Sequence, residues 1–320
     1  PAASGRCRYT DAAPMQLAAI DIGTNSIHMI LVRVAAGGAF EIIGREKDMV
    51  RLGAGGLEGR PLGEGSMAGA LQTLARFRRL ADSRQVDEIL AVATSAVREA
   101  PNGGDFLEAV AAQTGIRARV ITGAEEASII HRAAVHGIDI GGGPAVVIDI
   151  GGGSTEVTLG TATALQEAHS FRLGVIRLGD RFVKSDPLSD GDERRMVRHI
   201  RHELGDAASR LAKARYTRVI GTSGTALALG ALALQVPGDV TIHHRRVDAK
   251  AIRRIRRDVT RMTLAERLEL PGLDARRADL IVPGAVLLDT ILRQLGADDL
   301  TLCELSLREG VILEYIGRNL

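Results

Sequence analysis

Short apolar runs bounded by glycine-rich or polar turns recur along this 320-residue chain, between segments with helical apolar spacing. Runs at 17–22 and 27–34, separated by Gly-Thr-Asn-Ser, predict a strand, a tight turn and a second strand. Further strands are predicted at 40–45, 88–94, 117–121, 145–150, 157–159, 164–171, 217–220 and 301–304. Helices are predicted at 66–80, 106–113, 124–135, 190–214, 248–262, 276–295 and 306–316. This mixture predicts an α/β fold.

The opening pattern returns in the second half of the chain. Asp-Ile-Gly-Thr-Asn-Ser at 21–26 is matched by Asp-Ile-Gly-Gly-Gly-Ser at 149–154, and each copy follows an apolar run. A repeat of this length predicts two related domains rather than a solenoid. The Gly-Gly-Gly-Pro stretch at 141–144 is the best candidate for a linker.

Three turns of small residues follow predicted strands, and they are the first candidates for ligand binding. Such turns expose consecutive backbone N–H groups and let a phosphate approach closely. Neither the Walker A pattern nor the dinucleotide fingerprint is present. Tight hairpins that need glycine are the alternative, which explains the glycines but not the paired aspartates. The candidate phosphate-binding residues are Gly23, Thr24, Asn25, Ser26, Gly151, Gly152, Gly153, Ser154, Thr155, Gly221, Thr222, Ser223 and Gly224.

Acidic residues stand close to these turns. Asp21 and Asp149 end apolar runs, where a carboxylate needs a cation or hydrogen-bond donors. Mg²⁺ facing phosphate uses one or two carboxylates, so either aspartate is a candidate for a metal or metal-bound water, with turn capping as the alternative. Glu156 is a further candidate for such a contact, and Glu125 and Glu126 open the helix at 124–135. A carboxylate there could deprotonate a water molecule.

Basic residues give a weaker signal. Arg98 follows a buried strand and could clamp a phosphate, although a surface arginine at a helix start fits equally well. Segment 241–262 contains eight basic and two acidic residues, with apolar positions at helical spacing. A solvated helix face is the favoured interpretation and a polyanion track the alternative.

Composition limits the partners. The net charge is only +2, so no global field attracts a polyanion. The chain has three Tyr, five Phe and no Trp, which argues against base stacking, and no nucleic-acid partner is expected. The longest uncharged stretch, 219–238, is interrupted by polar residues, glycine and proline, so no membrane span is expected. Cys7 and Cys303 form no metal or redox pair and residues 1–14 lack an apolar run, which predicts a cytoplasmic location.

Taken together, these segments resemble the exopolyphosphatase/guanosine-pentaphosphate phosphohydrolase (Ppx/GppA) family, within the actin-like, sugar-kinase and heat-shock-chaperone superfamily. The resemblance rests on the two Asp-Ile-Gly turns with the residues around them and on five other segments. These are Arg-Leu-Gly at 51–53, Ala-Thr-Ser-Ala-Val-Arg at 93–98, Gly-Ala-Glu-Glu-Ala at 123–127, Gly-Thr-Ser-Gly-Thr at 221–225 and Ser-Leu-Arg-Glu-Gly at 306–310. They span residue 17 to the C-terminus.

The resemblance implies two actin-like (ribonuclease H-like, ASKHA) domains with a cleft between them. The first is expected at 15–136 with a C-terminal helix at 305–320, and the second at 137–304. The resemblance also implies that the chain is an exopolyphosphatase, which releases orthophosphate from the end of inorganic polyphosphate. By residue matching, Glu126 is the general base, with Glu125 an exposed neighbour. Asp149 and Glu156 hold Mg²⁺, with Mn²⁺ as an alternative, and Arg98 and the three turns hold phosphates.

The chain ends soon after residue 310, so it resembles the short two-domain form, and only local basic segments remain to follow a long polymer. Guanosine pentaphosphate is a second expected substrate, and a homodimer is an open alternative to a monomer. An actin-like phosphotransferase or kinase and an alarmone-binding regulatory protein are the alternative functions. The sequence does not decide chain-length preference, monovalent-ion dependence or the role of the glycine-rich loop at 51–65.

Overall fold

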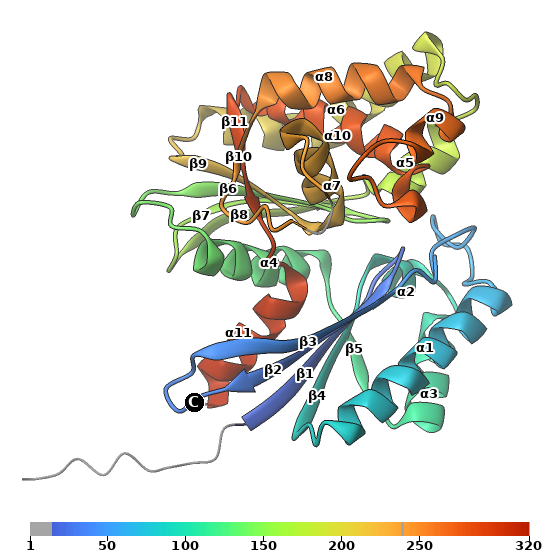
Figure 1. The fold of residues 1–320 in the computed structure, drawn as a ribbon, viewed down its shortest axis with the longest axis vertical. Helices are drawn as coiled ribbons and strands as arrows, with labels where there is room; N and C mark the ends of the chain where they lie inside the picture. The colour runs from blue at the N-terminus through green and yellow to red at the C-terminus, as the bar shows by residue number, and fades with distance from the viewer. Residues whose placement is uncertain (1–14, 238–239, 320) are drawn as a thin grey trace, which may run out of the picture.

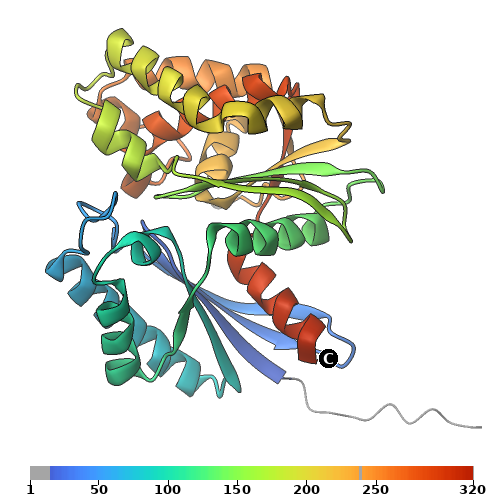
Figure 2. The same cartoon turned by 180° about the vertical axis from the view of Figure 1, so that it is seen from behind.

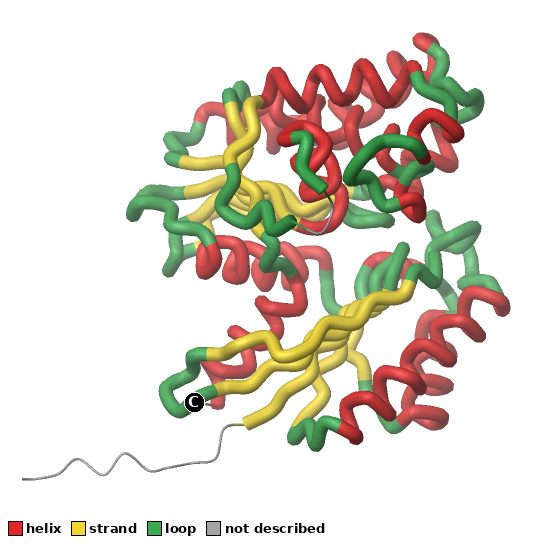
Figure 3. The backbone as a smooth tube through the Cα atoms, viewed as in Figure 1, coloured by secondary structure: helices red, strands yellow, loops and turns green. Residues whose placement is uncertain are grey.

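The computed structural model describes residues 15–237 and 240–319, and it shows two mixed β-sheets with helices packed on them (Figures 1 and 3). The first sheet has the strand order β3-β2-β1-β4-β5 and the second the order β10-β11-β9-β6-β7-β8. The predicted α/β class is therefore confirmed. Cys7 and the stretch 1–14 lie outside the described residues.

The first sheet is built from the amino-terminal part of the chain. Its strands are β1 (Met15–Ile22), β2 (Ile27–Val34), β3 (Phe40–Asp48), β4 (Glu88–Ala93) and β5 (Ala118–Val120). β1 pairs antiparallel with β2 and parallel with β4. The helices of this part are α1 (Glu64–Ser83), α2 (Ser95–Glu99), α3 (Gly103–Thr114) and α4 (Gly123–Gly137).

The second sheet uses the rest of the chain. Its strands are β6 (Ala145–Ile150), β7 (Thr155–Gly160), β8 (Leu165–Phe171), β9 (Arg218–Thr222), β10 (Arg246–Asp248) and β11 (Asp299–Cys303). Its helices are α5 (Val175–Phe182), α6 (Asp190–Lys213), α7 (Ser223–Leu234), α8 (Ala249–Arg261), α9 (Leu264–Leu268) and α10 (Ile281–Leu295), followed by the closing helix α11 (Leu307–Asn319). No helix among the described residues combines the length and the apolar character that crossing a membrane requires.

The sequence repeat is also a structural repeat. In β1 and β2, Asp21 pairs with His28, and in β6 and β7, Asp149 pairs with Glu156 at the equivalent register. The turn between each pair of strands closes with one backbone hydrogen bond, from Gly23 N to Ser26 O at 3.1 Å and from Gly151 N to Ser154 O at 3.0 Å. Both turns lie at the carboxyl end of a strand that has a parallel neighbour, where ligands bind in open α/β sheets.

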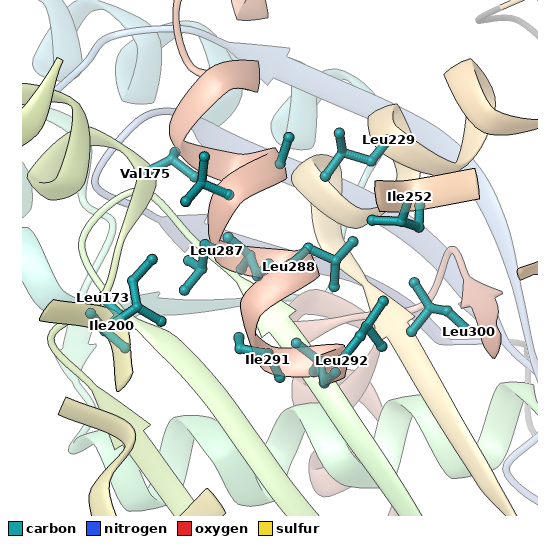
Figure 4. Packing of buried hydrophobic residues seen from close by; sticks show 14 of the residues in the cluster. Leu173, Val175, Ile200, Leu229, Ile252, Leu287, Leu288, Ile291, Leu292 and Leu300 are labelled. Carbon is teal, nitrogen blue, oxygen red and sulfur yellow. The ribbon is translucent and has the colours of Figure 1, made fainter. Parts of the chain in front are cut away.

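A buried helix forms the centre of the larger core. Leu287, Leu288, Ile291 and Leu292 of α10 point toward apolar side chains of the surrounding elements (Figure 4). Those neighbours include Leu173, Ile200, Leu229, Ile252 and Leu300. The continuous apolar surface of α10 explains why it is buried almost from end to end.

Two helices link the halves. α4 packs against β7 and β8 of the second sheet, although the predicted first domain includes it. α11 returns from the second sheet to pack on α4 and β1 (Figure 2). One apolar cluster consequently runs from Leu17 of the first sheet to Val147 of the second. The domain boundaries themselves stay a prediction.

Some elements differ from their predicted ranges. The helix predicted at 276–295 is two pieces, a 3-10 turn at Ala275–Arg277 and then α10. The Asp274 side chain accepts a hydrogen bond from Arg276 N and so caps the short turn separately. α2, α5, α9 and β10 were not predicted, because each is too short to show a periodic pattern.

Candidate functional site

The three small-residue turns meet at one cavity between the two sheets, with a volume of about 250 Å³. The first turn follows β1 and the second follows β6, whereas the third predicted turn consists of the end of β9 and the first residues of α7. The cavity is lined by Gly23, Thr24, Asn25 and Ser26 from the first turn, Gly151, Gly152, Gly153 and Ser154 from the second, and Ser223, Gly224 and Thr225 from the third. The fold thus brings together segments that are far apart in the sequence.

The first two turns also touch each other, so their glycines have a steric role. A Cβ atom on Gly152 would lie 3.2 Å from Asn25 N, and one on Gly153 would lie 2.8 Å from Thr24 Oγ1. The loop 51–65 supports the first turn, because Gly53 N donates to Thr24 O at 2.8 Å. Glycine is required at position 53 because a Cβ there would lie 2.2 Å from Thr24 Cγ2.

Apart from Arg98, three predicted phosphate ligands are not among the residues that line this cavity. Thr155 Oγ1 donates to Leu173 O at 2.5 Å, and Thr222 Oγ1 donates to Leu305 O at 2.6 Å. Gly221 lies against the side chain of Leu300. These contacts hold the strands in place behind the turns.

Two neighbouring glutamates in the first turn of α4 have opposite environments. Glu125 is exposed, and its carboxylate accepts a hydrogen bond from Thr122 N at 2.7 Å in a capping box. Glu126 is only 6% exposed and lines the cavity. Burial raises the pKa of Glu126 to about 8, while Arg98 opposes the shift. A carboxyl group with such a pKa can accept a proton near neutral pH.

Arg98 orients Glu126 from a neighbouring opening. Its Nη1 donates to Glu126 Oε2 at 3.0 Å and to Ile121 O at 2.7 Å. Arg98 lines a second cavity, of about 450 Å³, together with Gly123, Ser170 and Arg172. It therefore contacts Glu126 of the main cavity without lining that cavity itself.

The paired aspartates both line the main cavity, but their hydrogen bonds differ. Asp149 Oδ2 accepts from Ser223 Oγ at 2.5 Å and from Ser306 Oγ at 2.8 Å. Oδ1 of Asp21 is buried and has no hydrogen-bond partner among the described residues. Burial raises the pKa of Asp21 to about 7, and it also raises the pKa of Asp149, where the two serine hydroxyls oppose the shift.

Glu156 completes the acidic side of the cavity. It is 2% exposed, and its Oε1 accepts from Ser170 Oγ at 2.7 Å. Burial raises the pKa of Glu156 well above its usual range, and the nearby carboxylates of Glu126 and Asp149 add to the shift. Several carboxylates facing one cavity repel each other unless protons or a cation are present.

The donor set fits Mg²⁺. Asp21, Asp149, Glu126 and Glu156 offer oxygen ligands around one cavity, and the unpartnered Asp21 Oδ1 lacks a donor or cation. Within residues 15–237 and 240–319 no group of three or more His, Cys, Asp or Glu has the arrangement of a metal cage. Mg²⁺ bound with phosphate needs only one or two carboxylates, so the residues present are sufficient.

Cationic residues that sequence reasoning missed line the same cavity. They are Lys47 from β3, Arg277 from the turn before α10, and Arg308 from α11. Burial and, to a smaller extent, the neighbouring Arg277 lower the pKa of Lys47 to about 8. Arg308 lies in the Ser-Leu-Arg-Glu-Gly segment, which supports the family resemblance but does not by itself assign a binding role to the arginine. The sequence around Lys47 contains no motif that indicates a binding site.

Segment 241–262 does not contribute to the residues that line this cavity. α8 lies on the side of the second sheet away from the first sheet (Figure 1). Arg256 forms ion pairs with Glu193 and Asp289, and Arg253 lies 3.5 Å from Asp289. The favoured interpretation as a helix face fits these contacts, and the polyanion track finds no support in them.

Comparison with known proteins places this geometry in a family. Residues 30–319 match the model of the Ppx/GppA phosphatase family. Exopolyphosphatase 2 of Mycobacterium tuberculosis is 33% identical over 317 residues, which cover 94% of this chain and 99% of that protein. Exopolyphosphatase 1 of Mycobacterium leprae is 30% identical over 308 residues, with 94% and 90% covered.

Solved structures agree. An exopolyphosphatase from Cytophaga hutchinsonii superposes with a TM-score of 0.87 at 28% identity, covering 95% of this chain and 98% of that one. The Aquifex aeolicus Ppx/GppA family member gives 0.80 at 27% identity, with 96% and 99% covered. A nucleoside triphosphate hydrolase structure from Neospora caninum, at 13% identity and a TM-score of 0.54, shares the fold alone. The predicted actin-like (ASKHA) fold is confirmed.

Proposed function

Because the chain belongs to the Ppx/GppA phosphatase family, we propose that it hydrolyses the terminal phosphoanhydride of inorganic polyphosphate and releases orthophosphate. The named relatives are exopolyphosphatases, an enzyme class that hydrolyses phosphoanhydrides. The observation that carries the proposal is the buried carboxyl of Glu126 in a cavity lined by the three small-residue segments that are candidates for phosphate binding.

Glu126 is the proposed general base. Its carboxylate accepts the proton of a water molecule as that water attacks the terminal phosphorus in line with the leaving phosphate. Arg98 keeps the Oε2 atom of Glu126 at a fixed position through the 3.0 Å hydrogen bond. The exposed Glu125 has no part in this step, because its side chain caps α4.

The turns and cations bind the substrate. Backbone N–H groups of the first two turns face the terminal phosphate, and their small side chains leave room for it. Lys47, Arg277 and Arg308 bind the following phosphates, because these half-buried cations face the cavity and attract a polyanion. Mg²⁺, or Mn²⁺ in its place, would be held by Asp149 and Glu156, with Asp21 facing the metal or a water bound to it, and would offset negative charge on the phosphoryl oxygens.

Guanosine pentaphosphate is a second candidate substrate, supported by one feature. A further cavity of about 540 Å³ shares Gly224, Leu227, Arg277 and Glu304 with the main cavity. Its lining includes Ala228, Ala231, Ile242 and Leu273, which could receive the apolar face of a nucleoside. The scarcity of aromatic residues keeps polyphosphate as the preferred substrate.

The test is orthophosphate release from short polyphosphate, long polyphosphate and guanosine pentaphosphate, side by side with Mg²⁺, with Mn²⁺ and with a chelator. We expect metal-dependent release, faster from polyphosphate than from the nucleotide. Release that requires an acceptor such as ADP would instead favour the phosphotransferase, and tight binding without turnover would favour the regulatory protein. The proposed enzyme acts in the cytoplasm, and gel filtration decides between monomer and homodimer.

A further inference from the structure

His28 occupies the position in the first half of the molecule that Glu156 occupies in the second. It pairs with Asp21 across β1 and β2, just as Glu156 pairs with Asp149 across β6 and β7. His28 lines the main cavity, and the mechanism proposed above does not use it. The repeat therefore places an imidazole where its other copy has a carboxylate.

Both ring nitrogens of His28 have a partner. Nδ1 lies 2.8 Å from Nη1 of Arg308 on α11, and Nε2 lies 2.7 Å from Oγ of Ser26 in the first turn. Arg308 also lies 3.8 Å from the carboxylate of Glu309. The ring thus connects Arg308, near the end of the chain, to Ser26 in the first small-residue turn, near its beginning.

The chemistry of these partners fixes the proton of the ring. A guanidinium group can only donate hydrogen bonds, so Nδ1 must accept from Arg308 and carries no hydrogen. The neutral ring then carries its hydrogen on Nε2 and donates it to Ser26 Oγ. Burial and the charge of Arg308 lower the pKa of His28, which agrees with a neutral ring.

Ser26 is affected in turn. Its oxygen accepts from His28, and no other partner of that hydroxyl is found among the described residues. Ser26 lines the cavity, so its own O–H is available to donate to a ligand there. Arg308 likewise uses one nitrogen on His28 and keeps its remaining N–H donors for other groups.

We propose that His28 is a positioning residue that aims the Ser26 hydroxyl and the Arg308 guanidinium at the same phosphate-containing substrate. This inference rests on the proposed function, because it assumes that phosphates occupy the cavity. His28 itself exchanges no proton with the substrate. Its two hydrogen bonds hold the Ser26 hydroxyl and the Arg308 guanidinium in place, so that both can bind one phosphate group.

Two substitutions separate the two halves of the bridge. His28→Asn places an amide oxygen near the Nδ1 position, keeping the acceptor for Arg308 and losing the contact with Ser26. His28→Gln extends an amide N–H toward the Nε2 position, keeping the donor to Ser26 and losing the acceptor for Arg308. Since a hydrogen bond to a charged group is worth more, we expect His28→Gln to raise KM for polyphosphate about tenfold and His28→Asn about threefold. In both variants kcat should fall less than KM rises.

Arg308→Gln supplies the control for coupling. It should raise KM at least as much as His28→Gln, and adding His28→Gln to it should change KM little further, because the same contact is already lost. Two outcomes would overturn the inference: effects on KM that simply multiply, or equal losses of kcat and thermal stability in both His28 variants at unchanged KM.

A measurement without substrate keeps this inference separate from the proposed function. In the full chain labelled with ¹⁵N-histidine, the NMR spectrum should show that His28 is protonated on Nε2 and unprotonated on Nδ1. The Arg308→Gln substitution should shift the Nδ1 resonance. Protonation on Nδ1 would overturn the positioning role even in an active enzyme. A wild-type chain that releases no phosphate from polyphosphate would overturn the proposed function, whatever the tautomer.

Discussion

The two Asp-Ile-Gly turns have the same backbone but different surroundings. Each closes with a hydrogen bond from its first glycine to its serine, at 3.1 Å in the first turn and 3.0 Å in the second. Asp149 is held by Ser223 and Ser306, whereas Oδ1 of Asp21 has no partner in the described part of the chain. The repeat reproduces the loop geometry, and residues from elsewhere decide the electrostatics of each copy.

The helix α11 shows how this difference arises. Ser306 precedes α11, where a serine hydroxyl would ordinarily cap the helix, but its Oγ donates to Asp149 instead. Glu309 accepts from Ser306 N at 2.9 Å and so satisfies the helix start. A residue at the end of the chain therefore fixes the acid of the second turn, while the acid of the first turn is left for another ligand.

Among changes to the two turns, removing the charge of each aspartate is expected to have the largest effect. Asp149→Asn should lower kcat about 10²-fold or more and raise the Mg²⁺ concentration for half-maximal rate, because it weakens a proposed metal ligand. Asp21→Asn should also raise the Mg²⁺ requirement, with a smaller loss of kcat. Metal titrations of phosphate release measure both.

Thermal unfolding in the absence of metal tests whether Asp21 and Asp149 differ in their effect on stability. Asp21→Asn should raise the Tm at pH 8, because it removes a buried carboxyl whose pKa burial raises to about 7. Asp149→Asn should lower the Tm, because it weakens two serine hydrogen bonds, at a cost of about 1 kcal/mol. Equal shifts of the same sign would mean that the two turns are equivalent.

A methyl group between the turns should have the next largest effect. Gly152→Ala places a Cβ 3.2 Å from Asn25 N, so the first turn must shift by a few tenths of an ångström. Small displacements of positioned groups can cost about 10²-fold in rate, and we expect a loss of about 10-fold to 100-fold in kcat/KM. Gly142→Ala is unsuitable as a control because its φ is positive, whereas Gly65→Ala meets no atom within 4 Å and should retain activity.

The pH dependence should follow Glu126. Because burial raises its pKa to about 8, the active carboxylate forms as pH rises, and kcat/KM should increase between about pH 6 and 9. The folded state also binds this proton more tightly than the unfolded state, so the free energy of unfolding should fall between the ordinary pKa of 4.5 and about 8. Glu126→Gln should show a smaller fall in stability over that range, which thermal unfolding in a buffer series measures.

The smallest effect is expected from removing one of the two serine hydroxyls that donate to Asp149. Ser306→Ala removes one of its two hydroxyl donors and leaves Ser223 in place. We expect a few-fold loss of kcat and a loss of about 1 kcal/mol in stability. If Ser306→Ala lowers kcat as strongly as Asp149→Asn, then Ser306 acts on the substrate directly.

Local patterns were enough to predict the strands around the first two turns, whereas the choice of Glu126 over Glu125 depended on the family resemblance. Asp21, Asp149 and Glu156 could be found because acids stand out after apolar strands. Lys47 and Arg277 could not be predicted, since a lone cation carries no signal until the fold brings it to the cavity. The packing of α4 against the second sheet is likewise a long-range outcome that its own amphipathic pattern does not determine.

The central claim is that Glu126, and not its neighbour, activates the attacking water. Orthophosphate release from polyphosphate should be measured for wild type, Glu126→Gln and Glu125→Gln at saturating substrate and Mg²⁺. We predict a fall in kcat of about 10²- to 10⁴-fold for Glu126→Gln. Glu125→Gln should stay within about twofold of wild type, since glutamine also closes a capping box. A Glu126→Gln enzyme as fast as wild type would contradict the account.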